Sequence, residues 1–138
     1  MAAPPPPIAL ELAWQGDMRF AGRVDGVPVA VDGDRQTGPS PVQALATALA
    51  GCMAIDVLQV LTLGRRRLTG LTTHLTAERA AAEPRRLLRV DLRFVVAGEA
   101  PAHAVERAVA LSRETYCSVW HSLRPDIELR TSFEVRPD

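Results

Sequence analysis

Three short apolar runs follow one another near the start of the chain, at residues 8–14, 18–21 and 27–31. Glycine-containing turns separate them, and short apolar runs between such turns are typical of β-strands. We therefore predict a meander of three strands. Residues 1–7 include four consecutive prolines, which offer no backbone donors to a sheet, and we expect a flexible arm there, outside the fold.

The longest apolar stretch runs from residue 41 to residue 63 and has almost no polar face. Between positions 42 and 61 its polar residues are Gln43, Thr47, Asp56 and Gln59. Ser40 followed by Pro41 is typical of a helix start, because it places an N-cap residue before a proline at the first helical position. Gly64 is placed to end the helix as its C′ residue.

A helix that is apolar all round must be covered on every side or lie in a membrane. Four polar residues, one of them acidic, and an alanine-rich composition argue against a membrane span. One small sheet can cover only one side of such a helix, so a second copy of the chain is the expected cover for the rest. We therefore expect a homodimer without a membrane partner.

The second half of the chain begins with two alternating segments, 68–79 and 87–96, which predict a long antiparallel hairpin. A helical stripe follows at residues 105–116, and the spacing leaves open whether one helix or two form beyond it. Residues 127–135 alternate again and predict a last strand. The prediction is an α+β fold in which a mostly antiparallel sheet packs on a long buried central helix and a second helix, in a single domain at residues 8–138.

Charge and motifs exclude several classes of function. The chain has 138 residues, and its sixteen basic residues, all arginine, balance sixteen acidic ones. A chain without net charge has no single-sign field to hold a polyanion, so we expect no nucleic-acid partner. The first residues lack the pattern of a secretory signal, which favours a cytoplasmic location. Phosphate-binding loops and nucleophile elbows are absent from the sequence, and we expect no cofactor.

The two cysteines, Cys52 and Cys117, are the candidates for chemistry. In a reducing compartment a cysteine pair is rarely a permanent disulfide, so the two are either small buried hydrophobes or a reactive pair. Their spacing does not show whether they meet in space. With His121, one helical turn after Cys117, they would form an incomplete zinc ligand set, and structural zinc usually has four ligands at tighter spacings. We therefore expect no metal site.

Three segments carry a resemblance to a known family. They are Ser-Pro-Val-Gln-Ala-Leu at 40–45, Ala-Gly-Cys-Met-Ala-Ile-Asp-Val at 50–57 and Ala-Leu-Ser-Arg-Glu-Thr-Tyr-Cys-Ser-Val at 110–119. They resemble the two cysteine segments of the OsmC/Ohr family, the osmotically inducible and organic hydroperoxide resistance proteins. The order of the predicted elements between residues 8 and 135 resembles the family as well. The resemblance implies an OsmC-like fold and an intertwined homodimer with both cysteines at each active site.

The resemblance also implies an activity. It makes the chain similar to thiol-dependent peroxidases that reduce organic or other hydroperoxides in oxidative stress defence. Cys52 then corresponds to the peroxidatic thiolate, which becomes a sulfenic acid, and Cys117 to the resolving thiol that condenses with it to a disulfide. An external dithiol reductant restores both thiols. The alternative is a non-catalytic dimer that binds a small apolar ligand or senses redox state.

One position departs from the hydroperoxide-resistance branch. That branch has a glutamate ten residues before the first cysteine, which holds an arginine beside the thiolate, whereas this chain has Val42 there. It therefore resembles the OsmC-like branch without that glutamate. Arg19 and Arg23 both qualify as the arginine, and Asp56, one turn after Cys52, places a negative charge that opposes a thiolate. Glu114 is a further candidate for tuning the site.

Overall fold

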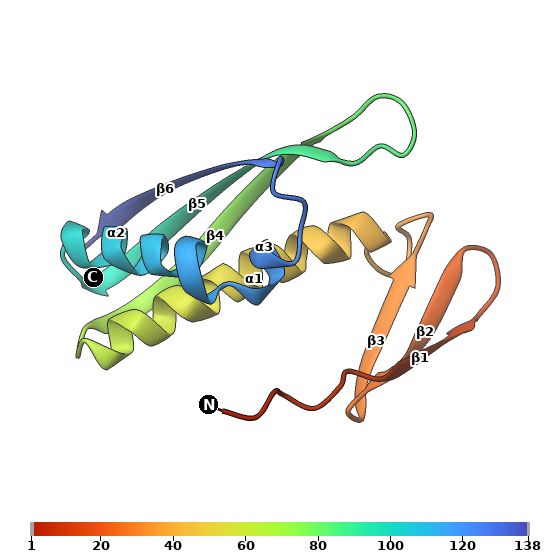
Figure 1. Cartoon of the computed structure of the whole chain (residues 1–138), viewed down its shortest axis with the longest axis horizontal. Coiled ribbons are helices and arrows are strands. Elements are labelled where there is room, and N and C mark those ends of the chain that lie inside the picture. The colour runs from red at the N-terminus through yellow and green to blue at the C-terminus, as the bar shows by residue number, and fades with distance from the viewer. Residues whose placement is uncertain (1, 138) are drawn as a thin grey trace. The chain divides into compact units, whose positions relative to one another are not determined.

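The computed structural model describes residues 2–137. They form two compact units, one up to Leu45 and one from Ala46 onward. The elements in chain order are β1 (Leu10–Trp14), β2 (Arg19–Val24), β3 (Val27–Asp32), α1 (Pro41–Leu63), β4 (Arg67–Arg79), β5 (Leu87–Glu99), α2 (Ala102–Leu111), the π-helical turn η1 (Ser112–Tyr116), α3 (Ser118–His121) and β6 (Glu128–Arg136), shown in Figure 1. The predicted α+β class is confirmed. Because α1 contributes to both units, the single domain at residues 8–138 stays a prediction.

The first unit contains the predicted meander, in which β2 pairs with β1 and with β3, antiparallel in both cases. Trp14 lies opposite Phe20, which in turn lies opposite Val31. Since side chains alternate between the faces of a sheet, this register gathers the apolar residues on one face. Several of them are exposed in the single chain, among them Leu10, Leu12, Trp14, Phe20 and Val27.

The loop after β3 is organised by a buried carboxylate. Asp32 accepts hydrogen bonds from the backbone N–H groups of Asp34, Gln36 and Thr37 and from the hydroxyl of Thr37. These bonds, led by the one from the Thr37 N–H, lower the pKa of Asp32 to about 2, against an opposing effect of burial. The four bonds fix the loop from which the chain enters α1.

Helix α1 begins at Pro41 and ends at Leu63, both as predicted. The Ser40 hydroxyl accepts from the Gln43 N–H at 3.2 Å, and the Gln43 side chain accepts from the Ser40 N–H at 2.9 Å, which is a capping box. The assignment of Gly64 as the C′ residue was wrong. Gly64 still donates to the Val60 carbonyl, and Arg65 takes the left-handed conformation, with φ of 61°.

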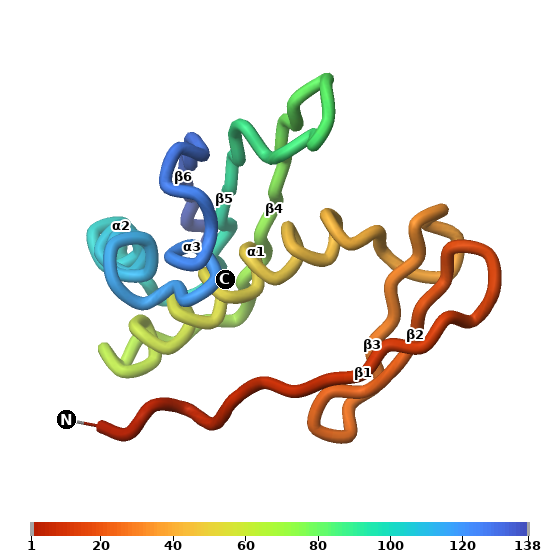
Figure 2. Tube along the Cα trace, turned by 45° about the vertical axis from the view of Figure 1, so that its right-hand side comes forward, coloured from red at the N-terminus to blue at the C-terminus, as the bar shows by residue number. Residues whose placement is uncertain are grey.

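The second unit is a three-stranded sheet in the order β4-β5-β6 with helices on one face (Figures 1 and 2). The hairpin of β4 and β5 is antiparallel, as predicted. Strand β6 pairs with β5 in parallel, because the chain crosses over through α2 between them. The sheet buries one apolar face, with Val90, Leu92, Phe94 and Val96 inaccessible to solvent or nearly so.

We predicted a buried central helix, but in the single chain α1 buries only part of its surface. Its fully buried residues form one stripe at intervals of four, namely Leu49, Met53, Val57 and Leu61. Ile55 is 57% exposed and Leu63 is 85% exposed. By length and composition alone α1 could also cross a membrane, with 22% of its most apolar window buried. One stripe of α1 is therefore fully buried, while other apolar residues such as Ile55, Leu58 and Leu63 are exposed.

The stretch after β5 forms two helices, which answers the question that the spacing left open. Helix α2 runs into η1, where the Cys117 N–H donates to the Ser112 carbonyl five residues earlier, at 2.8 Å. Cys117 itself is extended, with φ of −73° and ψ of 98°, and α3 begins after it. The π-turn and the break set the position of the Cys117 side chain, as π-turns often do at functional sites.

Candidate functional site

Helix α1 supplies two polar side chains to one place in the second unit. Cys52 and Asp56 are four residues apart, so they lie one above the other on the same face of the helix. Both are half-buried, whereas Met53 and Val57 beside them are fully buried. The face that carries the thiol and the carboxylate therefore borders the core.

Cys117 lies close to Cys52 and Asp56, and it comes from the chain segment between η1 and α3. It is fully buried and caps α3, because its Sγ accepts a hydrogen bond of 3.3 Å from the Trp120 N–H. A sulfur at a helix N-terminus lies at the positive end of the helix dipole, although α3 is only one turn long.

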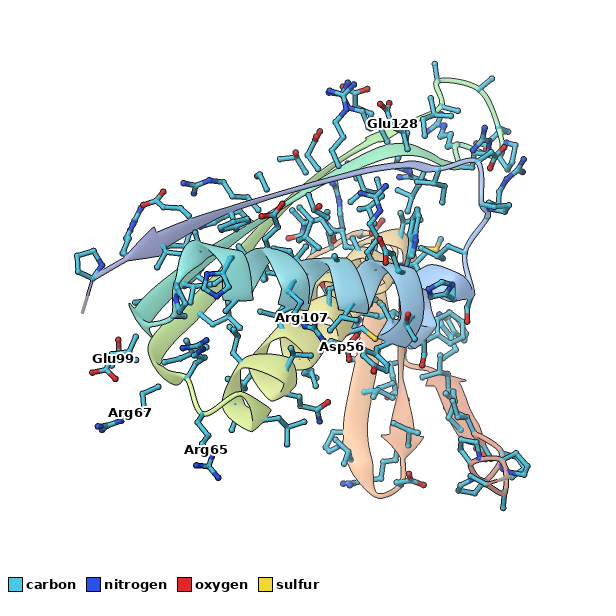
Figure 3. The ribbon with its side chains drawn as sticks, turned by 60° about the vertical axis from the view of Figure 1, so that its left-hand side comes forward. Asp56, Arg65, Arg67, Glu99, Arg107 and Glu128 are labelled. Atoms are coloured by element: carbon cyan, nitrogen blue, oxygen red, sulfur yellow. The ribbon has the colours of Figure 1, made fainter. Side chains whose placement is uncertain are left out.

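The ligand atoms of Cys52, Asp56 and Cys117 all lie within 4.8 Å of one another. Both cysteines are free thiols. The Ser112 hydroxyl donates a hydrogen bond of 2.8 Å to Oδ2 of Asp56, which ties η1 to α1, and Figure 3 shows Asp56 on α1 in this region. We call Cys52, Asp56 and Cys117 the thiol–carboxylate group. It can support disulfide chemistry or bind a cation.

The environment keeps Cys117 in its thiol form. Burial, and to a smaller extent the neighbouring Cys52 and Asp56, raise the pKa of Cys117 from 9.0 to about 11, while the Trp120 N–H opposes the shift. Desolvation dominates because a buried thiolate loses its hydration. At neutral pH, Cys117 is therefore a protonated thiol.

A cavity of about 490 Å³ borders the thiol–carboxylate group through Asp56. Its lining is Asp56, Gln59, Val60, Leu63, Leu111 and Tyr116. Four of these six side chains are aliphatic or aromatic, with the two polar ones on α1. Such a lining suits a molecule with an alkyl or aryl part and one polar end.

The other site residues that were predicted from the sequence have other positions and other partners within their own units. Arg19 and Arg23 lie on β2 in the first unit, where Arg19 donates to the Gln15 carbonyl and Arg23 to the Gly26 carbonyl. Val42 is half-buried in the first turn of α1. Glu114 is exposed on η1.

The zinc trio considered from the sequence does not form either. The Nε2 atom of His121 lies 3.0 Å from the Arg113 carbonyl oxygen, so this ring is engaged elsewhere. Asp56, and not His121, lies beside the two sulfurs. The four-residue spacing from Cys52 indicated Asp56 as a neighbour of that thiol, whereas no local signal pointed to Ser112 as the hydrogen-bond donor to Asp56.

Comparisons with known proteins agree on one family. The family model described as OsmC-like protein matches residues 32–132. Protein YhfA of Escherichia coli K12 is 36% identical over 125 residues, which are 88% of this chain and 93% of that protein. A hypothetical protein from Aquifex aeolicus has a solved structure with a TM-score of 0.89 at 24% identity, covering 96% of this chain and 98% of that one.

A more distant structural neighbour has a name that mentions redox chemistry. It is the organic hydroperoxide resistance protein OsmC of Legionella pneumophila, also called a predicted redox protein and regulator of sulfide bond formation. Its TM-score is 0.69 at 15% identity, covering 94% of this chain and 97% of that one. At this identity the likeness concerns the fold alone.

Proposed function

The chain belongs to the OsmC-like protein family, and from this premise we propose that it is a thiol-dependent peroxidase that reduces organic hydroperoxides in oxidative stress defence. The observation that carries the proposal is the pair of free thiols, Cys52 and Cys117, whose sulfur atoms lie within 4.8 Å of each other. Cys52 lies on α1 and Cys117 lies between η1 and α3, 65 positions later in the sequence (117 − 52). Such proximity allows a disulfide to form with little rearrangement.

The two thiols have different surroundings, which supports different roles. Cys52 is half-buried and Cys117 is fully buried. As a thiolate, Cys52 attacks the distal oxygen of the peroxide and breaks the O–O bond, which yields an alcohol once a proton is added and leaves Cys52 as a sulfenic acid. Burial and a raised pKa of about 11 keep Cys117 from attacking the peroxide itself. It is therefore assigned to the second step, in which the disulfide forms.

In that second step the Cys117 sulfur attacks the sulfenic sulfur of Cys52. The S–S bond forms, the S–O bond breaks, and water leaves with the proton from the Cys117 thiol. An external dithiol then reduces the disulfide by two exchange reactions and becomes a disulfide itself. No cofactor takes part in this cycle, because the electrons come from the dithiol.

The cavity beside Asp56 supports an organic substrate. Its walls include Val60, Leu63 and Leu111, which suit the alkyl part of a hydroperoxide. The polar end of such a molecule would lie toward Asp56 and the two sulfurs. Hydrogen peroxide has no apolar part to bind there, so we expect alkyl and aryl hydroperoxides to be better substrates.

We also propose that the active form is a cytoplasmic homodimer without nucleic-acid or membrane partners. Exposed apolar side chains on α1, such as Ile55 and Leu58, and the apolar face of the meander need cover. A second copy of this chain offers matching apolar faces, and symmetric pairing of such faces is the commonest form of oligomer.

A non-catalytic dimer that binds an apolar ligand or senses redox state is the second candidate. Asp56 favours it, because a carboxylate beside the two sulfurs opposes the thiolate that peroxide reduction requires. Val42 in place of a glutamate points the same way, since no carboxylate at that position can hold an arginine for the thiolate.

The experiment is an assay of alkyl hydroperoxide consumption with a dithiol and a metal chelator present. Cys52→Ser should reduce the rate to the uncatalysed background. With the dithiol left out, Cys117→Ser should consume one equivalent of hydroperoxide and then stop with Cys52 as a sulfenic acid, which a sulfenic-acid probe detects. Glu106→Gln, a change at an exposed residue of α2, is the matched control and should keep the wild-type rate. Equal rates for the wild type and Cys52→Ser would leave the ligand-binding dimer as the better explanation.

A further inference from the structure

We infer that Cys52, Asp56 and Cys117 form a binding site for a thiophilic divalent cation, with Zn²⁺ as the best match. The three donor atoms lie within 4.8 Å of one another, and they come from two elements of the same unit. The inference goes beyond the proposed peroxidase, because it stands on the geometry and chemistry of the donors and does not require peroxide reduction.

The donor spacing suits a small tetrahedral ion. With Zn–S distances of about 2.3 Å, two thiolate sulfurs on one zinc ion lie about 3.8 Å apart. The observed limit of 4.8 Å leaves a closing movement of about 1 Å or less, which a change of cysteine rotamer can provide. Sulfur ligands select Zn²⁺ over Mg²⁺ or Ca²⁺, which prefer oxygen.

The carboxylate is held in place by a neighbour that is not itself a donor. Ser112 is fully buried, and its hydroxyl donates to Oδ2 of Asp56. A carboxylate has about four lone-pair positions on its two oxygens, so this single bond leaves capacity for a metal. Hydrogen bonds that orient a ligating carboxylate in this way are typical of metal sites.

The charge of the group also calls for a cation. The ion pairs formed among residues 2–137 do not involve Asp56. Within the described residues, this half-buried carboxylate beside two sulfurs thus has a hydroxyl as its hydrogen-bond partner and no arginine. A divalent cation would neutralise this carboxylate and stabilise both thiolates.

Binding changes the chemistry that the thiols can do. Zn²⁺ replaces the protons of Cys52 and Cys117, which pass to the buffer, and no electrons are exchanged. Three protein donors leave the fourth tetrahedral position to water or another small ligand. Because the metal and the disulfide use the same sulfur atoms, the metal-bound form cannot also be the oxidised form.

The test uses the reduced full-length protein and Co²⁺ as a spectroscopic substitute for Zn²⁺. We expect one Co²⁺ per chain, with the d–d absorption of a tetrahedral site and thiolate-to-cobalt charge-transfer absorption, both lost when Zn²⁺ is added. Cys52→Ser and Cys117→Ser should each weaken the charge-transfer band. Asp56→Asn should lower Zn²⁺ affinity by at least about tenfold, since even residues that only orient a ligand contribute about that much.

Glu106→Gln removes an exposed carboxylate from α2 and should bind Zn²⁺ as the wild type does. Circular dichroism of each variant shows whether it is folded. Absence of the charge-transfer band in the folded wild type would overturn the site, and unchanged affinity in folded Asp56→Asn would overturn the role of the carboxylate. Peroxide is absent from this assay and metal is chelated in the peroxidase assay, so either proposal can fail while the other stands.

Discussion

Ser112 donates a hydrogen bond of 2.8 Å from its hydroxyl to Oδ2 of Asp56 and so joins the π-turn η1 to the central helix α1. The two residues are 56 positions apart in sequence, and Ser112 is inaccessible to solvent. The same π-turn carries the chain directly into Cys117. A single side-chain bond therefore helps to hold the second cysteine beside the first.

We predict that Ser112→Ala lowers the free energy of unfolding by about 1–3 kcal/mol, because hydrogen bonds to charged groups contribute about that much and the carboxylate loses its donor. Urea denaturation of the reduced protein measures the difference. The exposed Ser118→Ala on α3 is the matched control and should change stability by less than about 0.5 kcal/mol. Equal stability of the two variants would show that the Ser112 bond contributes nothing.

The central helix could be predicted closely from the sequence, and the reasons are local. Ser40 and Gln43 form the capping box that the first turn requires, and mostly apolar residues continue from there to Leu63. The helix ends at Leu63 as predicted, but the left-handed residue after it is Arg65 and not Gly64, which still donates to the Val60 carbonyl.

The candidate site depended on contacts that no local pattern encodes. The i, i+4 relation of Cys52 and Asp56 follows from helix geometry, but the arrival of Cys117 beside them depends on a π-turn and a break in the chain. The parallel pairing of β6 with β5 is also non-local, since alternation along residues 127–135 gives a strand but not its direction. The pairing of the thiols was expected from the family resemblance, whereas the position of Asp56 beside both sulfurs and its hydrogen bond from Ser112 were found only in the structure.

Acid should weaken the protein through Asp32. A carboxylate whose pKa is lowered to about 2 in the folded state, against 3.8 otherwise, adds stability that is fully present above pH 4 and is lost as the pH falls toward 2. We therefore predict that wild type and Asp32→Asn differ in unfolding midpoint at pH 6 and converge near pH 2. Asp34→Asn, a change at an exposed neighbour, should show no such convergence. A constant difference between wild type and Asp32→Asn at all pH values would contradict the assignment.

The last prediction concerns the open surface of α1. Ile55 is 57% exposed in the single chain, on the side of the helix away from the buried stripe of Leu49, Met53, Val57 and Leu61. If a second copy covers this side, Ile55→Glu places a charge in an apolar interface, where an unpaired charge costs several kcal/mol.

We expect wild type to have the mass of a dimer by light scattering at low micromolar concentration, and Ile55→Glu to dissociate or to unfold at a lower temperature. His103→Glu adds the same charge to an exposed position of α2 and should remain a dimer. A stable, folded wild-type monomer at that concentration would mean that α1 tolerates its apolar surface in water, and the homodimer would have to be abandoned.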